Sequence, residues 1–507
     1  MKKVLAAALC VILMFTALAG CGSGEGGGGT RLTVYFFGAN VPEDAGVVAA
    51  ANARLAELGL DITLNPIWGD WDAGPRIQTI LDTGDSSIDV VFTCSWAVNY
   101  TPNALRGNLA RLDDPANNLL EQYGQDMVAA VPEFLWNSFK LLKDGEQGIY
   151  AVPGYKDFAQ MYTWDVNNTR LNELGYDVSD FEWNSETLFD PKLEEAMAAA
   201  KELYGDAFFP MLPESTAFAR AMANFDADVT GLGVIAFPFD PVDPTQPENI
   251  EVGLTIENPD YVRVLEKLHE FYLKGFIDPR VGITAESNAT VTGNWNSGNY
   301  LFSERTYAYG YDVTASNERG IDAKFMPISS PIVSTIPAQG SGFGISAYSK
   351  NKEAAMQFLN AWYTDKELAT ILAYGVEGDH FVTNEDGTIT LDTDRRALFS
   401  PWRNGMGNIF ILPPQDIEGV NYYEEFKGYN DAGIGTTFLG FYFDTTPVEN
   451  EAAAIRNVVD EYQTAVSTGV ADPATEVPAY IEKLYAAGMQ KVLDEVNAQL
   501  QAFYATK

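Results

Sequence analysis

The sequence predicts an α/β fold with a parallel sheet, and three observations lead to that prediction. Strand patterns at residues 32–37, 62–67 and 88–93 alternate with helix patterns, an order typical of a parallel sheet covered by helices. The chain has 507 residues, enough for roughly two to four domains with apolar cores. Its 46% hydrophobic and 20% charged residues are ordinary for a globular protein and do not fit a disordered chain.

The elements at the start of the chain also indicate where a ligand could bind. The first strand is rich in β-branched and aromatic residues and ends at Gly38. In the following helix, apolar side chains recur every three or four positions, and Gly59 is a natural stop. Parallel sheets bind ligands beyond the carboxyl ends of their strands. The loops that begin at Gly38, Trp68 and Ser95 are therefore expected to face a ligand.

Further along the chain, proline and helix-capping residues mark the ends of strands and the starts of helices. A fourth strand is expected at residues 148–152, and Pro153 removes a backbone donor there and marks a candidate boundary between lobes. Asn258 and Pro259 predict the start of a helix, because they fit an N-cap and a first helical position. Two amphipathic helices are expected near the C-terminus.

The charge and the missing motifs limit the functions that the chain can have. It carries 32 Lys and Arg against 70 Asp and Glu, a net charge of −38, which disfavours binding to nucleic acid or to an anionic bilayer through a basic face. No Cys/His cluster has zinc-ligand spacing. Nucleotide-binding, serine-hydrolase and zincin motifs are also missing from the sequence. We therefore expect no cofactor, no metal and no nucleic-acid partner.

The N-terminus has the pattern of an export signal. Two lysines precede an apolar run at residues 4–18, which has the length of a signal-peptide core and is too short to span a membrane comfortably. The letters LAGC at residues 18–21 resemble the lipobox of bacterial lipoproteins, in which the cysteine is acylated. We expect residues 1–20 to be a signal peptide, Cys21 to carry a lipid and residues 21–30 to be a flexible tether. The alternative is a secreted protein without an anchor.

Aromatic residues supply the positive indication of a ligand. The chain contains 25 Tyr, 29 Phe and 9 Trp, and several of them lie at the predicted loop ends. Aromatic faces cover the C–H patches of sugar rings, while neighbouring polar groups bond the hydroxyls. A glycoside hydrolase also remains possible at this point, because its two carboxylates are recognised by their distance in space and not by a motif.

Taken in order, several motifs resemble the extracellular solute-binding proteins, family 1, of ABC importers, in the Gram-positive lipoprotein branch with an extended C-terminal region. They are the lipobox, IDVVFTCSW at 88–96, GIYAVP at 148–153, SGFGIS at 341–346, YGVEG at 374–378 and the segment from residue 440 onward. The resemblance implies a two-lobed, periplasmic-binding-protein-like clamshell with a helical C-terminal extension.

The resemblance also implies how the chain divides between the lobes. Three hinge crossings are expected, near residues 152–153, 337–338 and 381. The corresponding division is a first lobe of residues 31–153 and 338–381 and a second lobe of residues 154–337 and 382–507.

The function implied by the resemblance is transport. The protein would capture an oligosaccharide by hinge closure and deliver it to the permease subunits of an ABC importer, without acting as an enzyme. It would work as a monomer on the extracellular face of the cytoplasmic membrane, held there only by its lipid. The alternatives are a binding protein for a peptide or a polyamine, or a surface glycoside hydrolase.

The resemblance, carried over by position, also implies ligand contacts at loop ends and just beyond the hinge. Asp157 would be a charge-assisted acceptor for sugar hydroxyls, and Trp402 a platform from the far lobe. Trp71 and Trp295 are expected to be packing residues. The full set of expected contacts is Asn40, Trp68, Trp96, Tyr155, Asp157, Tyr309, Tyr311 and Trp402.

Overall fold

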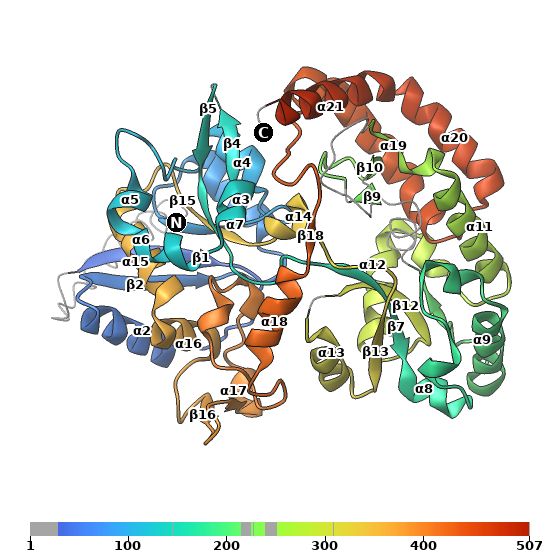
Figure 1. Cartoon of the computed structure of the whole chain (residues 1–507), viewed down its shortest axis with the longest axis horizontal. Helices are drawn as coiled ribbons and strands as arrows, with labels where there is room; N and C mark the ends of the chain where they lie inside the picture. Colours follow the sequence, from blue (N-terminus) through green and yellow to red (C-terminus); the bar gives the residue numbers. More distant parts are fainter. Residues whose placement is uncertain are drawn as a thin grey trace, which may run out of the picture.

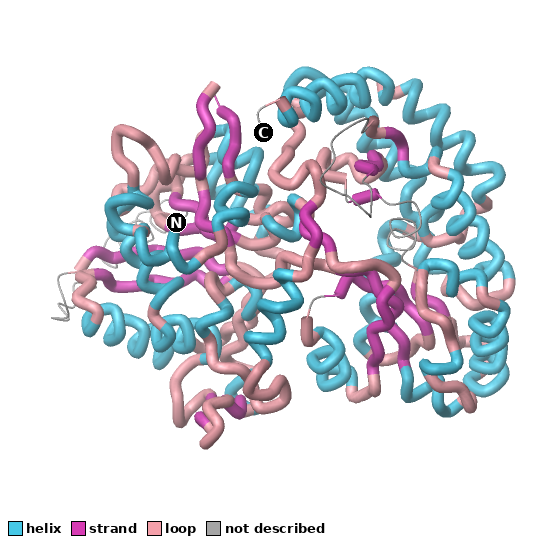
Figure 2. Tube along the Cα trace, viewed as in Figure 1, coloured by secondary structure: helices cyan, strands magenta, loops and turns pink. Residues whose placement is uncertain are grey.

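The chain folds into two lobes that lie side by side, each built on its own sheet (Figures 1 and 2). This confirms the two-lobed α/β fold. The computed structural model describes residues 29–143, 145–213, 225–226, 228–238, 251–307 and 309–505. The predicted signal peptide and Cys21 lie outside the described residues. Thr30, placed in the tether by the sequence, already pairs with Ile62 in the first sheet.

The first-lobe sheet has the strand order β2-β1-β3-β15-β6. Its strands are β1 (Thr30–Phe36), β2 (Ile62–Trp68), β3 (Val90–Thr93), β15 (Gly342–Ile345) and β6 (Ala151–Pro153). Strands β2 and β3 pair in parallel with β1, as predicted, whereas β15 runs antiparallel to both β3 and β6. Leu32 and Val34 of β1 are fully buried, because helices cover both faces of the sheet.

Helices and two hairpins surround this sheet. The helices are α2 (Ala45–Glu57), α3 (Gly74–Thr83), α4 (Tyr100–Arg106), α5 (Leu119–Tyr123), α6 (Gln125–Ala130), α7 (Glu133–Ser138), α14 (Thr335–Ala338), α15 (Lys352–Thr364), α16 (Lys366–Tyr374), α17 (Thr393–Arg396) and α18 (Tyr422–Asp431). The hairpins are β4 (Lys140–Lys143) with β5 (Glu146–Ile149), and β16 (Phe381–Thr383) with β17 (Ile389–Leu391). The single strand predicted at 148–152 is therefore split, because β5 pairs in a hairpin and only β6 joins the sheet.

Three segments connect the lobes, and they lie next to one another. We define the first crossing as residues 154–160, the second as 328–341 and the third as 432–437. Gln160 pairs with Ile332, and β14 (Ile332–Val333) pairs in parallel with β18 (Ile434–Gly435). Figure 1 shows α14 (Thr335–Ala338), which belongs to the second crossing, and β18 between the two lobes. The lobes are thus joined by three hydrogen-bonded chain segments.

The third crossing corrects the predicted division of the chain. The sequence placed this crossing near Phe381 and residues 382–507 in the second lobe. In the structure, Ile389, Met406, Phe410 and Phe426 are buried in the hydrophobic core of the first lobe. Burial of these side chains keeps the chain in the first lobe until the end of α18.

The second-lobe sheet has the strand order β13-β7-β12-β8. Its strands are β13 (Ala323–Pro327), β7 (Met161–Asn167), β12 (Phe302–Tyr307) and β8 (Met211–Leu212). The helices beside it are α8 (Asn168–Glu173), α9 (Pro191–Tyr204), α11 (Pro259–Leu273), α12 (Thr284–Asn296) and α13 (Tyr311–Arg319). As predicted, α11 begins at Pro259 after Asn258, whose side chain accepts from the amides of Asp260 and Tyr261.

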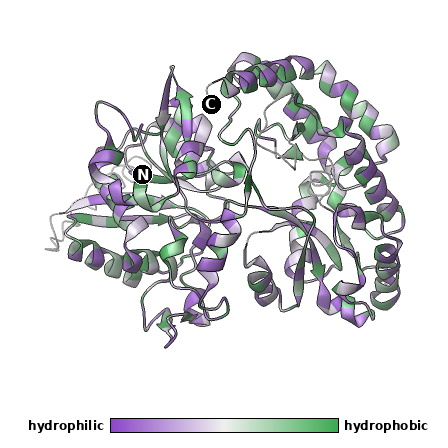
Figure 3. Ribbon diagram, in the orientation of Figure 1, coloured by the Kyte–Doolittle hydropathy of each residue, from purple (hydrophilic) through white to green (hydrophobic). Residues whose placement is uncertain are grey.

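A second core of this lobe holds the C-terminal helices α19 (Glu449–Ser467), α20 (Pro473–Ala486) and α21 (Met489–Tyr504). They pack on the small strands β9 (Phe225–Asp226), β10 (Ile235–Pro238) and β11 (Gly253–Leu254). Figure 3 shows hydrophobic and hydrophilic residues alternating along these three helices. Among the helices that the structure describes, none combines the length and apolar composition needed to cross a membrane.

Candidate ligand-binding site

Three tryptophans meet beyond the carboxyl edge of the first-lobe sheet. Trp71 follows β2 and Trp96 follows β3, and parallel strands bring such loops to the same edge. Trp402 comes from a distant part of the chain. It reaches this edge because Ser400 pairs with Asn40 after β1, through N–O distances of 3.1 and 2.9 Å.

We call Phe37, Trp71, Phe92, Trp96 and Trp402 the tryptophan cluster. The ring centroids of Trp71 and Trp402 are 5.2 Å apart, and those of Trp96 and Trp402 are 5.8 Å apart. Trp71 and Trp96 lie 6.3 Å from each other. These distances are those of aromatic rings in contact.

Exposure separates the cluster into a floor and a surface. Phe37 and Phe92 are 3% and 0% exposed, whereas Trp71 and Trp96 are 56% and 47% exposed. Indole rings are large and apolar, so this degree of exposure is unusual unless something binds there. The indole N–H of Trp96 donates to the carbonyl of Gly340 at 2.9 Å and fixes the orientation of the ring.

Two glycines make room for the rings. Gly38 has a φ of +71°, which disfavours other residues, and a Cβ atom there would lie 3.1 Å from Trp71 and 3.2 Å from Trp402. A Cβ atom on Gly405 would lie 2.6 Å from the ring of Trp402. The close approach of the tryptophan rings to the backbone therefore requires glycine at both positions.

A buried ion pair lies beside the cluster. Lys156 and Asp157 are 5% and 8% exposed, and the Lys156 Nζ to Asp157 Oδ1 distance is 2.7 Å. The amide of Asn404 donates to the same oxygen at 3.3 Å. A Cβ atom on Gly340, which holds Trp96, would lie 3.1 Å from Lys156 Nζ. One oxygen of Asp157 is thus already shared by two donors.

Trp68 and Asn40 occupy different positions from the cluster. Trp68 stacks on Phe36 with centroids 4.4 Å apart, and its indole N–H donates to Asp44 at 2.7 Å. It also contacts Phe399 edge-on. These contacts make Trp68 a packing residue at the rim of the first core. Asn40 is exposed, and its backbone holds the Trp402 loop in place.

Tyr155 lies on the first crossing and is half-buried. The ring centroids of Tyr155 and Phe410 are 4.4 Å apart, and the Tyr155 ring also stacks on Phe158. Burial raises the pKa of the Tyr155 hydroxyl. Its amide donates to the carbonyl of Gly407 at 2.9 Å. Tyr155 therefore joins the hinge to the segment that follows Trp402.

Tyr309 and Tyr311 lie in the second lobe, just after β12 ends at Tyr307. The ring of Tyr309 packs on Tyr422 and Phe426 of α18, and its hydroxyl donates to Glu425 of the same helix. Burial of the hydroxyl, and to a smaller extent its hydrogen bond to the Glu425 carboxylate, raises the pKa of Tyr309 to about 12. Tyr309 therefore ties the second lobe to the first.

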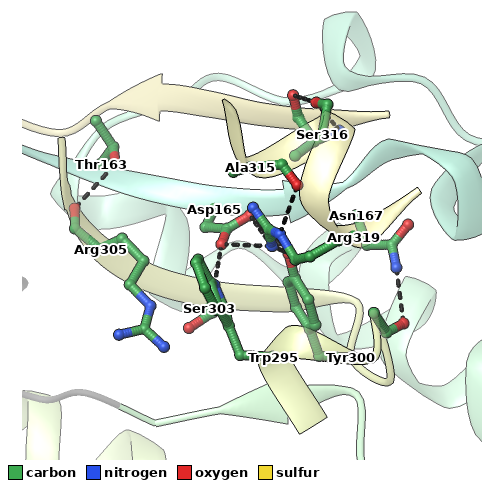
Figure 4. A network of polar contacts seen from close by, with 12 residues as sticks. Thr163, Asp165, Asn167, Trp295, Tyr300, Ser303, Arg305, Ala315, Ser316 and Arg319 are labelled. Carbon is green, nitrogen blue, oxygen red and sulfur yellow. Dashed lines mark hydrogen bonds and ion pairs between the residues drawn. The ribbon is translucent and has the colours of Figure 1, made fainter. Parts of the chain in front are cut away.

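Tyr311 belongs to a different group of side chains, around Trp295 (Figure 4). Its ring contacts Trp295 at 6.1 Å and Phe325 at 5.2 Å, and burial raises the pKa of its hydroxyl. Within the described residues, neither Tyr309 nor Tyr311 makes a ring contact with the tryptophan cluster, so the structure does not bring all eight expected residues together.

The residues around Trp295 form what we call the Asp165 network: Asp165, Trp295, Tyr300 and Arg319. Asp165 is fully buried on β7 and accepts from Trp295 Nε1 at 2.6 Å and from Tyr300 Oη at 2.8 Å. Arg319 Nη1 lies 3.1 Å from the same carboxylate, with its side chain 2% exposed. Figure 4 shows these groups converging on Asp165.

The faces of the Trp295 ring are occupied by cations. The guanidinium carbons of Arg319 and Arg305 lie 4.1 and 4.6 Å from its centroid, and Figure 4 shows the two arginines on either side of the indole. Trp295 is therefore a packing residue, as the sequence analysis expected.

Trp71 is the residue that sequence reasoning missed. It was expected to be a packing residue, yet it is the most exposed tryptophan of the cluster. The available signal was its place in the WGDW loop after β2, which had been singled out as facing a ligand. The two tryptophans of that loop were assigned the opposite roles.

Comparisons with known proteins agree with this architecture. The family model described as "Bacterial extracellular solute-binding protein" matches residues 38–369, and a domain of unknown function, DUF3502, matches residues 437–505. A carbohydrate ABC transporter substrate-binding protein of Streptococcus pneumoniae is 27% identical over 522 aligned residues, covering 100% of this chain and 99% of that protein.

Solved structures give the same result. The N-glycan transport solute binding protein NgtS of S. pneumoniae superposes with a TM-score of 0.77 at 26% identity, over 94% of this chain and 99% of that one. Its complex with Man5GlcNAc gives a TM-score of 0.71 at 25% identity, with the same coverage. A solute-binding protein of Bifidobacterium longum infantis shares the fold, with a TM-score of 0.63 at 17% identity and coverage of 94% and 99%. The first family model covers well over half of the chain, so the protein belongs to the bacterial extracellular solute-binding proteins.

Proposed function

We propose that this protein captures an oligosaccharide between its lobes and delivers it to the permease subunits of an ABC importer. No covalent bond of the sugar changes in this function. Closure of the two lobes about the three crossings would follow from the higher affinity of the closed form for the ligand.

The observation that carries this proposal is the half-exposed surface of the tryptophan cluster. Trp71, Trp96 and Trp402 present uncharged aromatic area at the edge of the sheet where ligands bind in α/β proteins. Sugar rings have apolar C–H faces that stack on such surfaces. An uncharged oligosaccharide therefore suits this surface better than a small ion.

Polar groups for the sugar hydroxyls lie next to the rings. We propose that Asp157 accepts hydrogen bonds from sugar hydroxyls as a charge-assisted acceptor. It would do so through its second carboxylate oxygen, because Lys156 and Asn404 both contact Oδ1. Asn40 would add an exposed amide near Trp402. We retain Tyr155 as a neighbour of the site and propose only indirect roles for Trp68, Tyr309 and Tyr311.

The relatives support the choice of ligand class. The S. pneumoniae relative is described as a carbohydrate ABC transporter substrate-binding protein, and NgtS has been crystallised with Man1GlcNAc and Man5GlcNAc. The same relatives and the family support an ABC permease as the partner. The chain covers nearly the full length of these proteins, so the comparison extends to both lobes.

Calorimetric titration of the mature chain with a panel that includes Man1GlcNAc, Man5GlcNAc and plant oligosaccharides tests the proposal. The chain would carry Cys21→Ser to prevent acylation, and each mixture would be chromatographed afterwards. Saturable binding with intact sugar is the expected result. Cleaved sugar would instead indicate a glycoside hydrolase, and a lack of binding across the panel would favour peptides or polyamines.

We also propose that the mature protein begins at Cys21 and is held at the outer face of the cytoplasmic membrane by a lipid on that cysteine. The support is the lipobox-like sequence and the glycine-rich segment that follows it. Expression with radiolabelled palmitate should label the wild type and not Cys21→Ser. Equal labelling of both proteins would contradict the anchor.

A further inference from the structure

The loop that carries Trp96 is bonded to the second crossing. The amide of Ser95 donates to the carbonyl of Gln339 at 2.9 Å, and its hydroxyl donates to the carbonyl of Ile336 at 2.8 Å. Trp96 Nε1 adds the bond to Gly340 at 2.9 Å. Three hydrogen bonds thus connect this tryptophan loop to one segment of the hinge.

The loop that carries Trp402 is bonded to the first crossing in a similar way. The amide of Tyr155 donates to Gly407 at 2.9 Å, and the amide of Ile409 donates back to the carbonyl of Tyr155 at 3.0 Å. Asn404 then reaches the carboxylate of Asp157 at 3.3 Å. This bond joins a side chain two residues after Trp402 to a charged group of the hinge.

The crossings are also fixed to the first lobe and to each other. Asn430, 2% exposed at the end of α18, accepts from the amides of Phe158 and Ala159 and donates to the carbonyl of Lys156 at 3.0 Å. The third crossing begins two residues after Asn430. Any displacement of the first crossing is therefore transmitted to its neighbours through hydrogen bonds.

We propose that Asn404 is a positioning residue that fixes Trp402 relative to the first crossing, so that a ligand stacked on Trp402 acts on the hinge. The ligand-coupled part of this inference rests on the proposed function. The Asn404 amide lies 3.3 Å from a carboxylate oxygen that a buried lysine already holds at 2.7 Å, so the acceptor that it reaches is itself fixed in position. The same carboxylate is thus both a neighbour of the site and part of the hinge.

The variants are chosen to separate this link from general damage to the fold. Asn404→Ala removes the amide. Asn384→Ala is the matched control, because Asn384 is also a half-buried asparagine of the first lobe, whose amide bonds Thr388 at 3.0 Å in the β16–β17 hairpin.

Hydrogen exchange without any ligand tests the link directly. In Asn404→Ala, the amides of Tyr155 and Ile409 should exchange faster, because the bonds that they make join the loop to the hinge. The control should leave the exchange of these amides unchanged. Unchanged exchange in Asn404→Ala overturns the proposal, whatever the ligand is.

The distance between the lobes tests whether a ligand stacked on Trp402 acts on the hinge through Asn404. Spin labels on Leu58→Cys in the first lobe and Leu203→Cys in the second would report the distance between the lobes. Both positions are exposed, at 37% and 56%, and the native Cys94 is fully buried. With saturating Man5GlcNAc, the wild type and the control should close, whereas Asn404→Ala should close incompletely and bind about fivefold to tenfold more weakly.

The two possible failures are distinguishable. If the wild type binds no glycan of the panel, the proposed function fails while the exchange measurement still decides the link. If Asn404→Ala closes fully and binds within twofold of the wild type, the coupling is wrong although the glycan function stands.

Discussion

The tryptophan cluster of the first lobe and Trp295 of the second lobe place the same residue type in opposite surroundings. In the first lobe, the cluster rests on buried phenylalanines and leaves about half of the surface of Trp71 and Trp96 exposed. In the second lobe, Trp295 is flanked by Arg305 and Arg319, and its N–H is bonded to buried Asp165. The residue type is the same, and what covers the faces of the ring determines whether it can bind.

The two regions also differ in where their charged side chains lie and how deeply these are buried. The cluster has a charged pair beside it, but within the described part of the chain its rings make none of the face contacts with cations that surround Trp295. The Asp165 network has a carboxylate and a guanidinium almost fully removed from water. The fold can tolerate loss of an exposed ring, whereas a buried ion pair cannot tolerate loss of one partner.

The largest expected effect is on the Asp165 network. Asp165→Ala would leave the buried guanidinium of Arg319 without its counter-charge, and it should lower the free energy of unfolding by about 3–5 kcal/mol. Urea unfolding followed by circular dichroism measures the change. The double variant Asp165→Asn with Arg319→Met should recover much of the loss. A loss below about 1 kcal/mol in the single variant would show that the network does not hold the lobe together.

The next effect distinguishes the two kinds of tryptophan. Trp96→Ala should weaken glycan affinity at least about tenfold, or about 1.4 kcal/mol, with little change in unfolding. Trp295→Ala should do the reverse, since its ring is packed between cations and contributes to stability. Calorimetric titration and thermal unfolding of both variants make the comparison. Unchanged affinity in Trp96→Ala would remove Trp96 from the site.

Trp71 tests more directly whether exposure of a tryptophan ring indicates contact with the ligand. Trp71→Ala should weaken glycan binding about threefold to tenfold while changing the free energy of unfolding by no more than about 0.5 kcal/mol, as for an exposed side chain. Trp68→Ala is the natural counterpart, because Trp68 stacks on Phe36 and should cost stability. Equal affinity of Trp71→Ala and the wild type would show that the ligand does not reach this part of the cluster.

The smallest effect concerns an ion pair of the first lobe that is not fully buried. Arg54 and Asp365 are 24% and 18% exposed, and Arg54 lowers the pKa of the Asp365 carboxyl through a side-chain hydrogen bond. Asp365→Asn keeps an N-cap acceptor for the amide of Leu368 but removes the charge. The thermal midpoint should fall by only about 1–2 °C, since partly exposed pairs contribute little.

The pH dependence of this variant follows from the sign of the shift. A carboxyl whose pKa is lowered by folding contributes stability above its ordinary pKa, about 3.9, and loses that contribution as the pH falls through the lowered value. The wild type should therefore exceed Asp365→Asn by a constant amount between about pH 5 and 8, and the two should converge in more acidic solution. A difference that grows as the pH falls would contradict the assignment.

The elements predicted from sequence are those that local patterns determine. The first strands and α11 lie within a few residues of their predicted positions, because side-chain periodicity and the N-cap Asn258 act over short distances. The third crossing was misplaced by some fifty residues. Its position depends on whether Met406 and Phe426 pack in one core or the other, and no local pattern contains that information.

The site was predictable in part for the same reason. Trp96 and Trp402 were expected as contacts, and both are in the cluster. The surroundings of Trp68 and Trp71 were harder to predict, because both flank one short loop and only distant partners distinguish them. Asp44 and Phe36 hold Trp68 inward, whereas Trp71 meets Trp402 from another part of the chain.

Helix α11 makes the C-terminal segment inseparable from the rest of the second lobe. It contributes Tyr261 and Leu265 to the core of the C-terminal helices, and Val264 and Leu268 to the core of the sheet. A separate family model matches residues 437–505, which suggests a cassette that could be exchanged between relatives. Removal of this segment would instead expose one side of α11 to water, so the segment and the helix must evolve together.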